Sequence, residues 1–298
     1  MAVVVILLAG CEKESGNTVD NTPVKACITS SIDGMATRAA NTAWAAGDHI
    51  GVYAVEWGTT QVRTNADYVT KDGDGVFTAV GEDFYFSSKE TVDFSAYYPF
   101  TGTSGNSPGL IRKAISAADQ TPVGQAQIDY LYARASGSAA QPNVQFRFDH
   151  CMSRIVLKFL PGDGITSLSD IEYTLDGVLP AGTFDPTAGE AEADIAMPAA
   201  ALTMSVPGSD AAELSSSLIF FPQKGDDDKT LTLTMRGVTY TATFKFRENT
   251  ANNNVRELAA GYSYLYNVKV NNATMTISPA TIGNWGDGGS EDIDSTAK

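Results

Sequence analysis

Strict alternation of apolar and polar side chains runs through most of this 298-residue chain, and helical periodicity is hard to find. Ile50, Val52 and Ala54 face one way behind the turn at residues 47–48. A period of two places alternate side chains on opposite faces of a strand, so each run of this kind predicts a half-buried β-strand. The pattern predicts an all-β chain. Further runs of the same kind lie at Val92, Phe94, Ala96 and Tyr98, and from Tyr262 to Val270.

The region from Leu231 to Phe246 predicts a β-hairpin. Two alternating runs in this region are separated only by Arg236 and Gly237. A two-residue linker that contains glycine suits a tight hairpin turn, because glycine accepts the positive φ that such turns require. The apolar positions are Leu231, Leu233 and Met235 in the first run, and Val238, Tyr240, Ala242, Phe244 and Phe246 in the second.

The apolar register shifts once near the middle of the chain. Apolar residues hold even positions from Val144 to Phe148 and odd positions from Ile155 to Phe159. A one-residue shift exchanges the two faces of a strand. A β-bulge between Cys151 and Arg154 would keep both halves facing one core.

A segment of linker composition precedes this region. Residues 135–142 are alanine, serine and glycine followed by Gln141 and Pro142, so we predict a domain boundary near residue 142. The length of the chain suits about two domains. We therefore expect two tandem β-sandwich domains, at residues 39–142 and 143–298, the second with a short acidic tail.

The first eleven residues predict export. Residues 1–11 form a short apolar run that ends in Leu8-Ala9-Gly10-Cys11, which is typical of a bacterial lipoprotein signal. Cys11 is then the lipidation site, and its acyl chains tether the exported domain. No Lys or Arg precedes the apolar run, and the alternative is a frayed apolar N-terminus.

A polar leader follows at residues 12–38. It contains one alternation, Val24, Ala26 and Ile28, which predicts at most one strand. Arg38 stands alone in a small polar segment, so the Arg38–Ala39 bond is open to a trypsin-like protease, unless Arg38 is an ordinary surface arginine. If the leader strand belongs to the first sandwich, cleavage would let it leave. The groove left behind would have unpaired N–H and C=O groups that a strand of another subunit could fill.

Composition excludes some partners. The formal net charge of −15 disfavours nucleic acid and anionic membrane surfaces, because both would repel the chain. No later segment has the roughly 20 apolar residues that a membrane-spanning helix needs. Beyond Cys11, the cysteines Cys27 and Cys151 could form a disulfide, although Cys151 fits a small buried apolar residue better.

No set of residues predicts an enzyme. His49 and His150 have no partner at metal-ligand spacing, and Cys151 beside His150 would point to the opposite face of a strand. Residues 72–75 and 226–228 fit acidic turns better than calcium loops. We therefore predict no catalytic residue, no metal and no cofactor. The aromatic residues Trp57, Tyr68 and Tyr85 could stack on a sugar, but packing is the favoured interpretation.

Several short motifs are spread along nearly the whole chain. They are the lipobox at Cys11, Thr37-Arg38-Ala39, Trp44, residues 47–53, Phe94–Pro99, Asp129–Ala133, Phe148–Ile155, Phe221-Pro222-Gln223 and Gly261–Val270 with Ile282 and Trp285. Taken together in order and spacing, these motifs resemble the fimbrillin-like proteins, which are lipoprotein-exported fimbrial subunits of Gram-negative anaerobes. The resemblance implies two transthyretin-like β-sandwich domains, export as an outer-membrane lipoprotein and, for stalk subunits, cleavage after an arginine followed by donor-strand assembly with other fimbrial subunits. Cys11 would be the lipidated residue and Arg38–Ala39 the processing site.

By the same resemblance, Trp44, Tyr98, Tyr130 and His150 would define the fold rather than react. The leading hypothesis is a fimbrial structural subunit or accessory adhesin that assembles by strand addition. The alternative is a lipid-anchored surface protein that does not polymerise, either a fimbrial anchor or an adhesin for a glycan or for host or bacterial surface ligands. Stalk, tip and anchor roles stay open.

Overall fold

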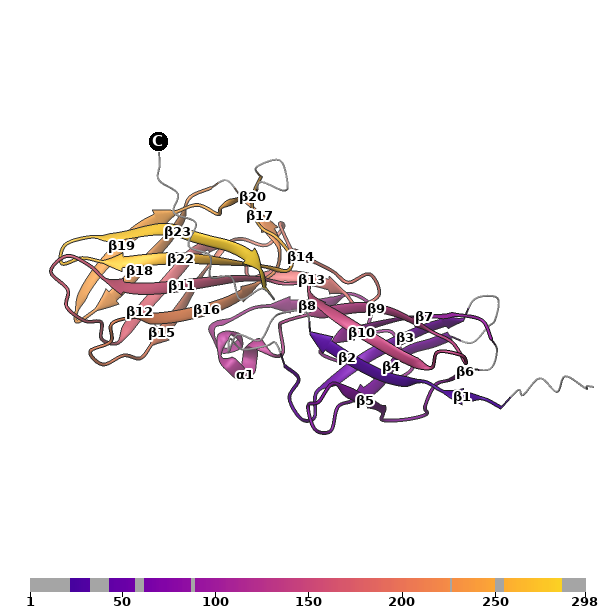
Figure 1. The fold of residues 1–298 in the computed structure, drawn as a ribbon. Coiled ribbons are helices and arrows are strands. Elements are labelled where there is room, and N and C mark those ends of the chain that lie inside the picture. Colours follow the sequence, from indigo (N-terminus) through magenta and orange to yellow (C-terminus); the bar gives the residue numbers. More distant parts are fainter. Residues whose placement is uncertain are drawn as a thin grey trace, which may run out of the picture.

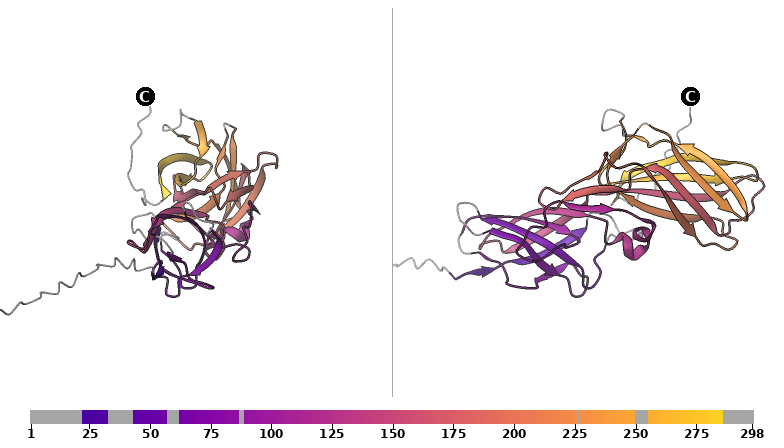
Figure 2. Two further views of the ribbon diagram at one scale, coloured as in Figure 1. Left: turned by 90° about the vertical axis from the view of Figure 1, so that its right-hand side faces the viewer. Right: turned by 180° about the vertical axis from the view of Figure 1, so that it is seen from behind.

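The computed structural model describes residues 22–32, 43–56, 62–86, 89–225, 227–249 and 255–285. Within them the chain is all-β, as the alternation predicts, and its strands form two bodies that lie end to end (Figure 1; Figure 2). No helix in these ranges is long and apolar enough to cross a membrane.

The first body is a closed barrel with the strand order β10-β2-β5-β4-β3-β7-β9. The alternation fills its core with one side chain in two from each strand, including Ile50, Val52 and Phe94. The strands are β2 (Cys27–Ile32), β3 (His49–Glu56), β4 (Val62–Val69), β5 (Val76–Ala79), β7 (Val92–Tyr98), β9 (Leu131–Gly137) and β10 (Asn143–His150). A short two-stranded sheet of β1 (Val24–Lys25) and β6 (Tyr85–Phe86) lies beside it.

The second body is built from two four-stranded sheets, β16-β11-β22-β23 and β15-β12-β18-β19, which share one core. This is the layered arrangement that we expected of a sandwich. The strands are β11 (Ser153–Pro161), β12 (Ile171–Val178), β15 (Ala200–Val206), β16 (Leu214–Phe220), β18 (Lys229–Met235), β19 (Val238–Phe244), β22 (Tyr262–Val270) and β23 (Met275–Asn284). A small sheet of β17 (Gln223–Lys224), β20 (Glu248–Asn249) and β21 (Val255–Leu258) accompanies them.

The predicted hairpin is confirmed. β18 and β19 pair antiparallel with Met235 opposite Val238, and the two residues between them have positive φ, 52° at Arg236 and 77° at Gly237. Both central residues of a type I′ turn need positive φ, and its twist matches that of the flanking strands.

Another three-stranded sheet joins the two bodies. β8 (Ile111–Ala114) lies between barrel strands in the sequence, yet it pairs with β13 (Ala181–Asp185), which in turn pairs with β14 (Glu190–Ala193). A separate apolar cluster at this junction takes Tyr97 and Tyr130 from the barrel side and Phe184 and Phe221 from the other. The 3₁₀ helix Ala117–Gln120 and the short helix α1 (Pro122–Gln125) follow β8.

The middle of the chain differs from the prediction in two respects. β10 follows residue 142 but pairs with β2 and β9, so the chain passes from the barrel to the second body only after His150. The register shift is a break between β10 and β11 rather than a bulge, because the strands serve different cores. Residues 144–148 fill the barrel and residues 155–159 fill the second body. The first body is also closed rather than an open sandwich, since β2 joins β10 to β5.

Candidate assembly site

The leader contributes the strand that closes the barrel. β2 lies between β10, with which it pairs parallel from Cys27 opposite Asn143 to Ile32 opposite Phe148, and β5, with which it pairs antiparallel. The Ser30 N–H donates to the carbonyl of Gly75 at 2.8 Å. Gly75 has a φ of 80°, and a Cβ there would collide with the Ser30 carbonyl oxygen, so the β4–β5 turn approaches the leader closely only because residue 75 is glycine.

The leader residues that face the barrel core have smaller side chains than the β10 residues beside them. Ala26 and Ile28 are buried in the barrel core, at 6% and 2% exposure, and Ile32 packs against its edge. Burying one isoleucine contributes roughly 1.5–3 kcal/mol. The neighbouring β10 presents Val144, Phe146 and Phe148 to the same core, all fully buried. The slot occupied by β2 is therefore lined with larger apolar groups than β2 itself supplies.

Ser30 fits this slot poorly. Its hydroxyl oxygen is buried and has no hydrogen-bond partner among the described residues. A buried hydroxyl without a partner costs roughly 1–3 kcal/mol relative to one that is satisfied. The leader strand thus closes the barrel with a polar defect on its inward face.

Trp44 fixes the chain on the other side of the predicted cleavage site. It is 9% exposed, and its ring packs edge-on against Phe77, Tyr98 and Phe148 at centroid distances of 5.2, 5.4 and 5.3 Å. A small cavity of about 90 Å³ is lined by both Ile32, at the end of β2, and Trp44. The chain after residue 43 is therefore anchored in the barrel independently of β2.

The predicted processing residues themselves lie outside the described ranges. This applies to Cys11, Arg38 and Ala39, which therefore stay predictions. The described chain ends at Ile32 before Arg38 and resumes at Ala43 after it. Val24, Ala26 and Ile28 predicted at most one leader strand, whereas the structure has two short strands, β1 and β2, with Ala26 between them.

The two remaining cysteines are both free thiols. Cys27 is exposed on β2, whereas Cys151 is buried, so no disulfide joins them. Burial raises the pKa of the Cys151 thiol above its ordinary value, since the thiolate would lose its hydration. Cys151 is thus the small buried apolar residue that its sequence context favoured.

Both histidines have carboxylate partners that are distant in the sequence. His150 Nδ1 lies 2.8 Å from an Asp129 carboxylate oxygen, and both side chains are 2% exposed. The His150 ring stacks on Trp285 with centroids 4.3 Å apart. His49 Nδ1 lies 2.7 Å from Asp67. Local spacing could not reveal these pairs, because each partner comes from another strand or loop.

The His150 group holds the junction together. Arg154 lies over the Trp285 ring at 5.1 Å, and its guanidinium donates to the Trp285 carbonyl at 3.4 Å. These contacts tie the end of β10 and the start of β11 to the end of β23. Within the described residues, no group of three or more His, Cys, Asp or Glu side chains is placed to hold a metal ion.

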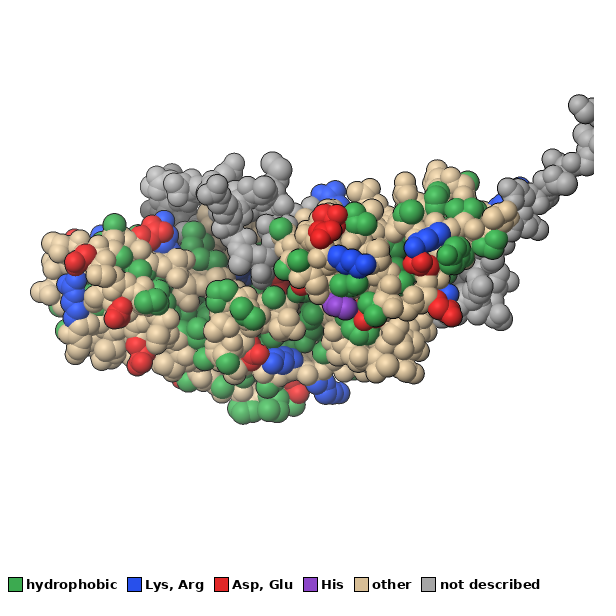
Figure 3. Space-filling model, turned by 90° about the horizontal axis from the view of Figure 1, so that it is seen from below, with side chains coloured by type: hydrophobic (Ala, Val, Ile, Leu, Met, Phe, Trp, Pro, Cys, Tyr) green, Lys and Arg blue, Asp and Glu red, His purple; other side chains and the backbone are tan. Residues whose placement is uncertain are grey.

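The other candidates from the sequence are structural or lie outside the described ranges. The segment Asp72–Gly75 forms the β4–β5 turn, where the Asp74 carboxylate accepts from the Val76 N–H at 2.9 Å. Tyr68 is only 4% exposed, so it cannot stack on a sugar, while Tyr85 is 46% exposed. Trp57 and Asp226 lie outside the described residues. On the face shown in Figure 3, basic and acidic side chains are interspersed among apolar and polar ones.

Comparison with known proteins agrees with this architecture. Residues 37–285 match the family model described as fimbrillin-like. The chain is 29% identical to a Bacteroides uniformis protein named "Putative fimbrium subunit Fim1C", over 96% of this chain and 94% of that protein.

Solved structures are similar over the same extent. A crystal structure named "putative cell adhesion protein" from Bacteroides ovatus aligns with a TM-score of 0.78 and 32% identity, covering 89% of this chain and 98% of that chain. Another of the same name, from Bacteroides uniformis, has the same fold, with a TM-score of 0.65 at 21% identity over 87% of this chain and 98% of that chain. Because the family model spans most of the chain, and both bodies are shared with these structures, the chain belongs to the fimbrillin-like family.

Proposed function

We propose that this protein is a cell-surface fimbrial subunit or accessory adhesin that assembles by exchange of its leader strand. Cys11 carries the lipid that brings the exported chain to the outer membrane. Cleavage of the Arg38–Ala39 bond then separates β2 from the rest of the barrel, and a strand from another fimbrial subunit takes its place. Its relative is named as a fimbrium subunit, which supports this class of function.

The observation that carries the proposal is the position of β2. Among the described residues, β2 is the barrel strand that precedes Arg38, and it closes the barrel between β10 and β5. After cleavage no covalent bond would hold β2. Its departure would leave unpaired main-chain groups on both neighbouring strands, which is the template that an added strand needs.

The inward side chains of the leader favour replacement of β2 by a strand from another subunit over rebinding of β2 itself. An incoming strand that places an apolar residue where Ser30 now lies would remove the buried, unpartnered hydroxyl. Larger apolar side chains at the positions of Ala26 and Ile32 would bury more surface against the β10 side chains. Main-chain pairing would be equal for the two strands, so these side chains would decide which of them occupies the slot.

Substitution of Arg38 tests this function. Arg38→Ala removes the side chain that a trypsin-like protease recognises, so we expect unprocessed chains in the outer-membrane fraction and no SDS-resistant oligomers on a gel. Arg112→Ala is the matched control, since Arg112 is an exposed arginine on β8, outside the leader. Oligomers formed by Arg38→Ala as readily as by the unaltered chain would refute cleavage as the trigger.

The form recovered from native membranes separates the two candidate functions. An N-terminus at Ala39 within oligomers supports the fimbrial subunit. A monomer that keeps acylated Cys11 supports the lipid-anchored binding protein.

A further inference from the structure

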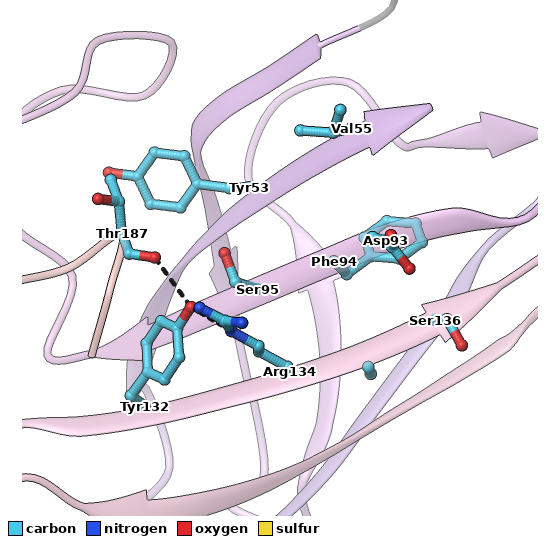
Figure 4. A pocket seen from close by; sticks show the side chains of 10 residues that line it. Tyr53, Val55, Asp93, Phe94, Ser95, Tyr132, Arg134, Ser136 and Thr187 are labelled. Carbon is cyan, nitrogen blue, oxygen red and sulfur yellow. Dashed lines mark hydrogen bonds between the residues drawn. The ribbon is translucent and has the colours of Figure 1, made fainter. Parts of the chain in front are cut away.

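An open hollow of about 520 Å³ lies on the outer face of the barrel, where β3, β7 and β9 run side by side (Figure 4). Except for Phe94 and Ala135, which pack in the barrel core, the side chains that β3, β7 and β9 supply alternate with the core residues and point away from the barrel interior. The residues that line it are Tyr53, Val55, Asp93, Phe94, Ser95, Tyr132, Arg134, Ala135, Ser136 and Thr187. A hollow of this volume holds a ligand of one to a few sugar rings.

The register of the three strands arranges these side chains in two rows. Ser95 lies in the middle of the first row, opposite Tyr53 on one side and opposite Arg134 on the other. Asp93 lies in the middle of the second row, between Val55 and Ser136. In the first row the small Ser95 side chain therefore forms a floor between the larger Tyr53 and Arg134 side chains (Figure 4).

One end of the hollow is closed by the three-stranded sheet at the junction. The turn between β13 and β14 places Thr187 beside Tyr132, whose hydroxyl donates to the Thr187 carbonyl at 2.9 Å. The Asp185 carboxylate holds this turn, since it accepts from the Thr187 N–H at 2.8 Å and from the Thr187 hydroxyl at 2.7 Å. The wall is thus fixed before any ligand arrives, which lowers the ordering cost of binding.

The polar groups of the hollow form a charge-balanced set. The Arg134 Nε donates to the Tyr132 hydroxyl at 3.0 Å, which leaves the terminal guanidinium N–H groups for another acceptor. No ion pair joins Arg134 or Asp93 to another side chain within the described ranges. One unpaired donor group and one unpaired acceptor group therefore face the same hollow, and their charges cancel.

These features exclude several ligands. The hollow lies on the face of the sheet, over the β3–β7 and β7–β9 ladders, so a peptide seated in it cannot add a strand to a sheet edge. The net charge of −15 repels nucleic acid. A ligand with one net charge would be attracted by Arg134 or Asp93 and repelled by the other.

We propose that this hollow binds a neutral saccharide. Asp93 accepts hydrogen bonds from sugar hydroxyls, Arg134 donates to sugar oxygens, and the apolar edge of a ring lies against Tyr53 and Val55. This inference does not rest on the proposed function, because the hollow is complete in the unprocessed chain and does not involve β2.

The test is a glycan array of neutral and acidic saccharides probed with the full chain, followed by titration of the best neutral saccharide. We expect binding in the millimolar range or tighter. Asp93→Asn and Arg134→Gln should each weaken it roughly tenfold or more, since each removes a charge-assisted hydrogen bond. Ser95→Tyr should abolish it by filling the floor.

Arg236→Gln is the matched control, because this arginine lies in the β18–β19 turn of the second body, and it should leave affinity unchanged. Arg38→Ala should also bind normally, which keeps this test separate from assembly. The proposal is overturned if no neutral saccharide binds, if Ser95→Tyr binds as well as the unaltered chain, or if an acidic saccharide binds more tightly than every neutral one.

Discussion

At the scale of single residues, Ser30 distinguishes the leader from a permanent barrel strand. The other inward positions of the leader carry Ala26, Ile28 and Ile32, and Ser30 interrupts them with a hydroxyl that has no partner among the described residues. Such a group destabilises the closed barrel without preventing it from forming. In the strand exchange that we propose, this defect would favour the departure of β2.

Removing the hydroxyl should stabilise the unprocessed chain. We predict that Ser30→Ala raises the free energy of unfolding by about 1 kcal/mol, because no buried polar group is then left unpaired. Urea unfolding measures the change. Ser31→Ala, on the exposed side of β2, is the control and should have almost no effect. A lower stability for Ser30→Ala than for the control would show that the hydroxyl is satisfied.

Single residues also show where sequence reasoning stops. Exposure of Cys27 and burial of Cys151 agree with their contexts, and the acidic turn at residues 72–75 was predicted. The partners of His150 were not, because Asp129 and Trp285 reach it only through the tertiary fold. The hollow was missed for the same reason, since its residues come from four separate segments.

At the scale of elements, the turn between β13 and β14 depends on one ionised carboxylate. The hydrogen bond from the Thr187 hydroxyl, with those from the Thr187 and Ala188 N–H groups, lowers the pKa of Asp185 below its ordinary value. A lowered pKa in the folded state means that the carboxylate contributes stability above its unfolded pKa. That contribution is lost as pH falls through the lowered folded value.

This turn should therefore weaken in acid. We predict that Asp185→Ala lowers the thermal midpoint at neutral pH, and that the difference from the unaltered chain shrinks below about pH 4. Thermal unfolding at a series of pH values measures it. Asp163→Ala, which removes an exposed carboxylate elsewhere, should show a smaller difference at neutral pH. A difference for Asp185→Ala that stays constant into acid would contradict the assignment.

Elements differ in how far local sequence predicts them. Alternation located β3, β7, β22 and the β18–β19 hairpin, because each depends on local period and turn chemistry. The closure of the barrel was not predictable in this way. β2 pairs parallel with β10, and nothing in either sequence encodes a partner so distant along the chain.

At the scale of the whole molecule, contacts at the junction hold the two bodies together. The Phe184 ring is fully buried and stacks on Tyr130 with centroids 4.7 Å apart. The pairing of β8 with β13 crosses the same junction. Main-chain pairing and aromatic packing together therefore connect the two bodies.

Loss of this packing should loosen the connection. We predict that Phe184→Ala destabilises the chain by roughly 3–5 kcal/mol and increases the radius of gyration measured by small-angle X-ray scattering. Phe159→Ala is the control, because Phe159 is equally buried but lies in the core of the second body. It should cost similar stability and leave the scattering of the folded chain unchanged. Identical scattering from both variants would show that Phe184 does not hold the junction.

The central claim is that β2 must leave the barrel before subunits assemble, and a reversible covalent lock tests it most directly. Cys27 on β2 lies opposite Asn143 on β10, both are exposed, and neighbouring strands are about 4.8 Å apart, which suits a disulfide. Asn143→Cys should therefore tie the leader to the barrel even after Arg38 is cut, whereas Asn143→Ser should not.

The measurement is the yield of SDS-resistant oligomers before and after reduction, with the disulfide verified by mass spectrometry. We predict no oligomers from processed Asn143→Cys chains while the disulfide is intact, and oligomers at the level of Asn143→Ser once it is reduced. Oligomers of equal yield with the disulfide intact would contradict strand exchange.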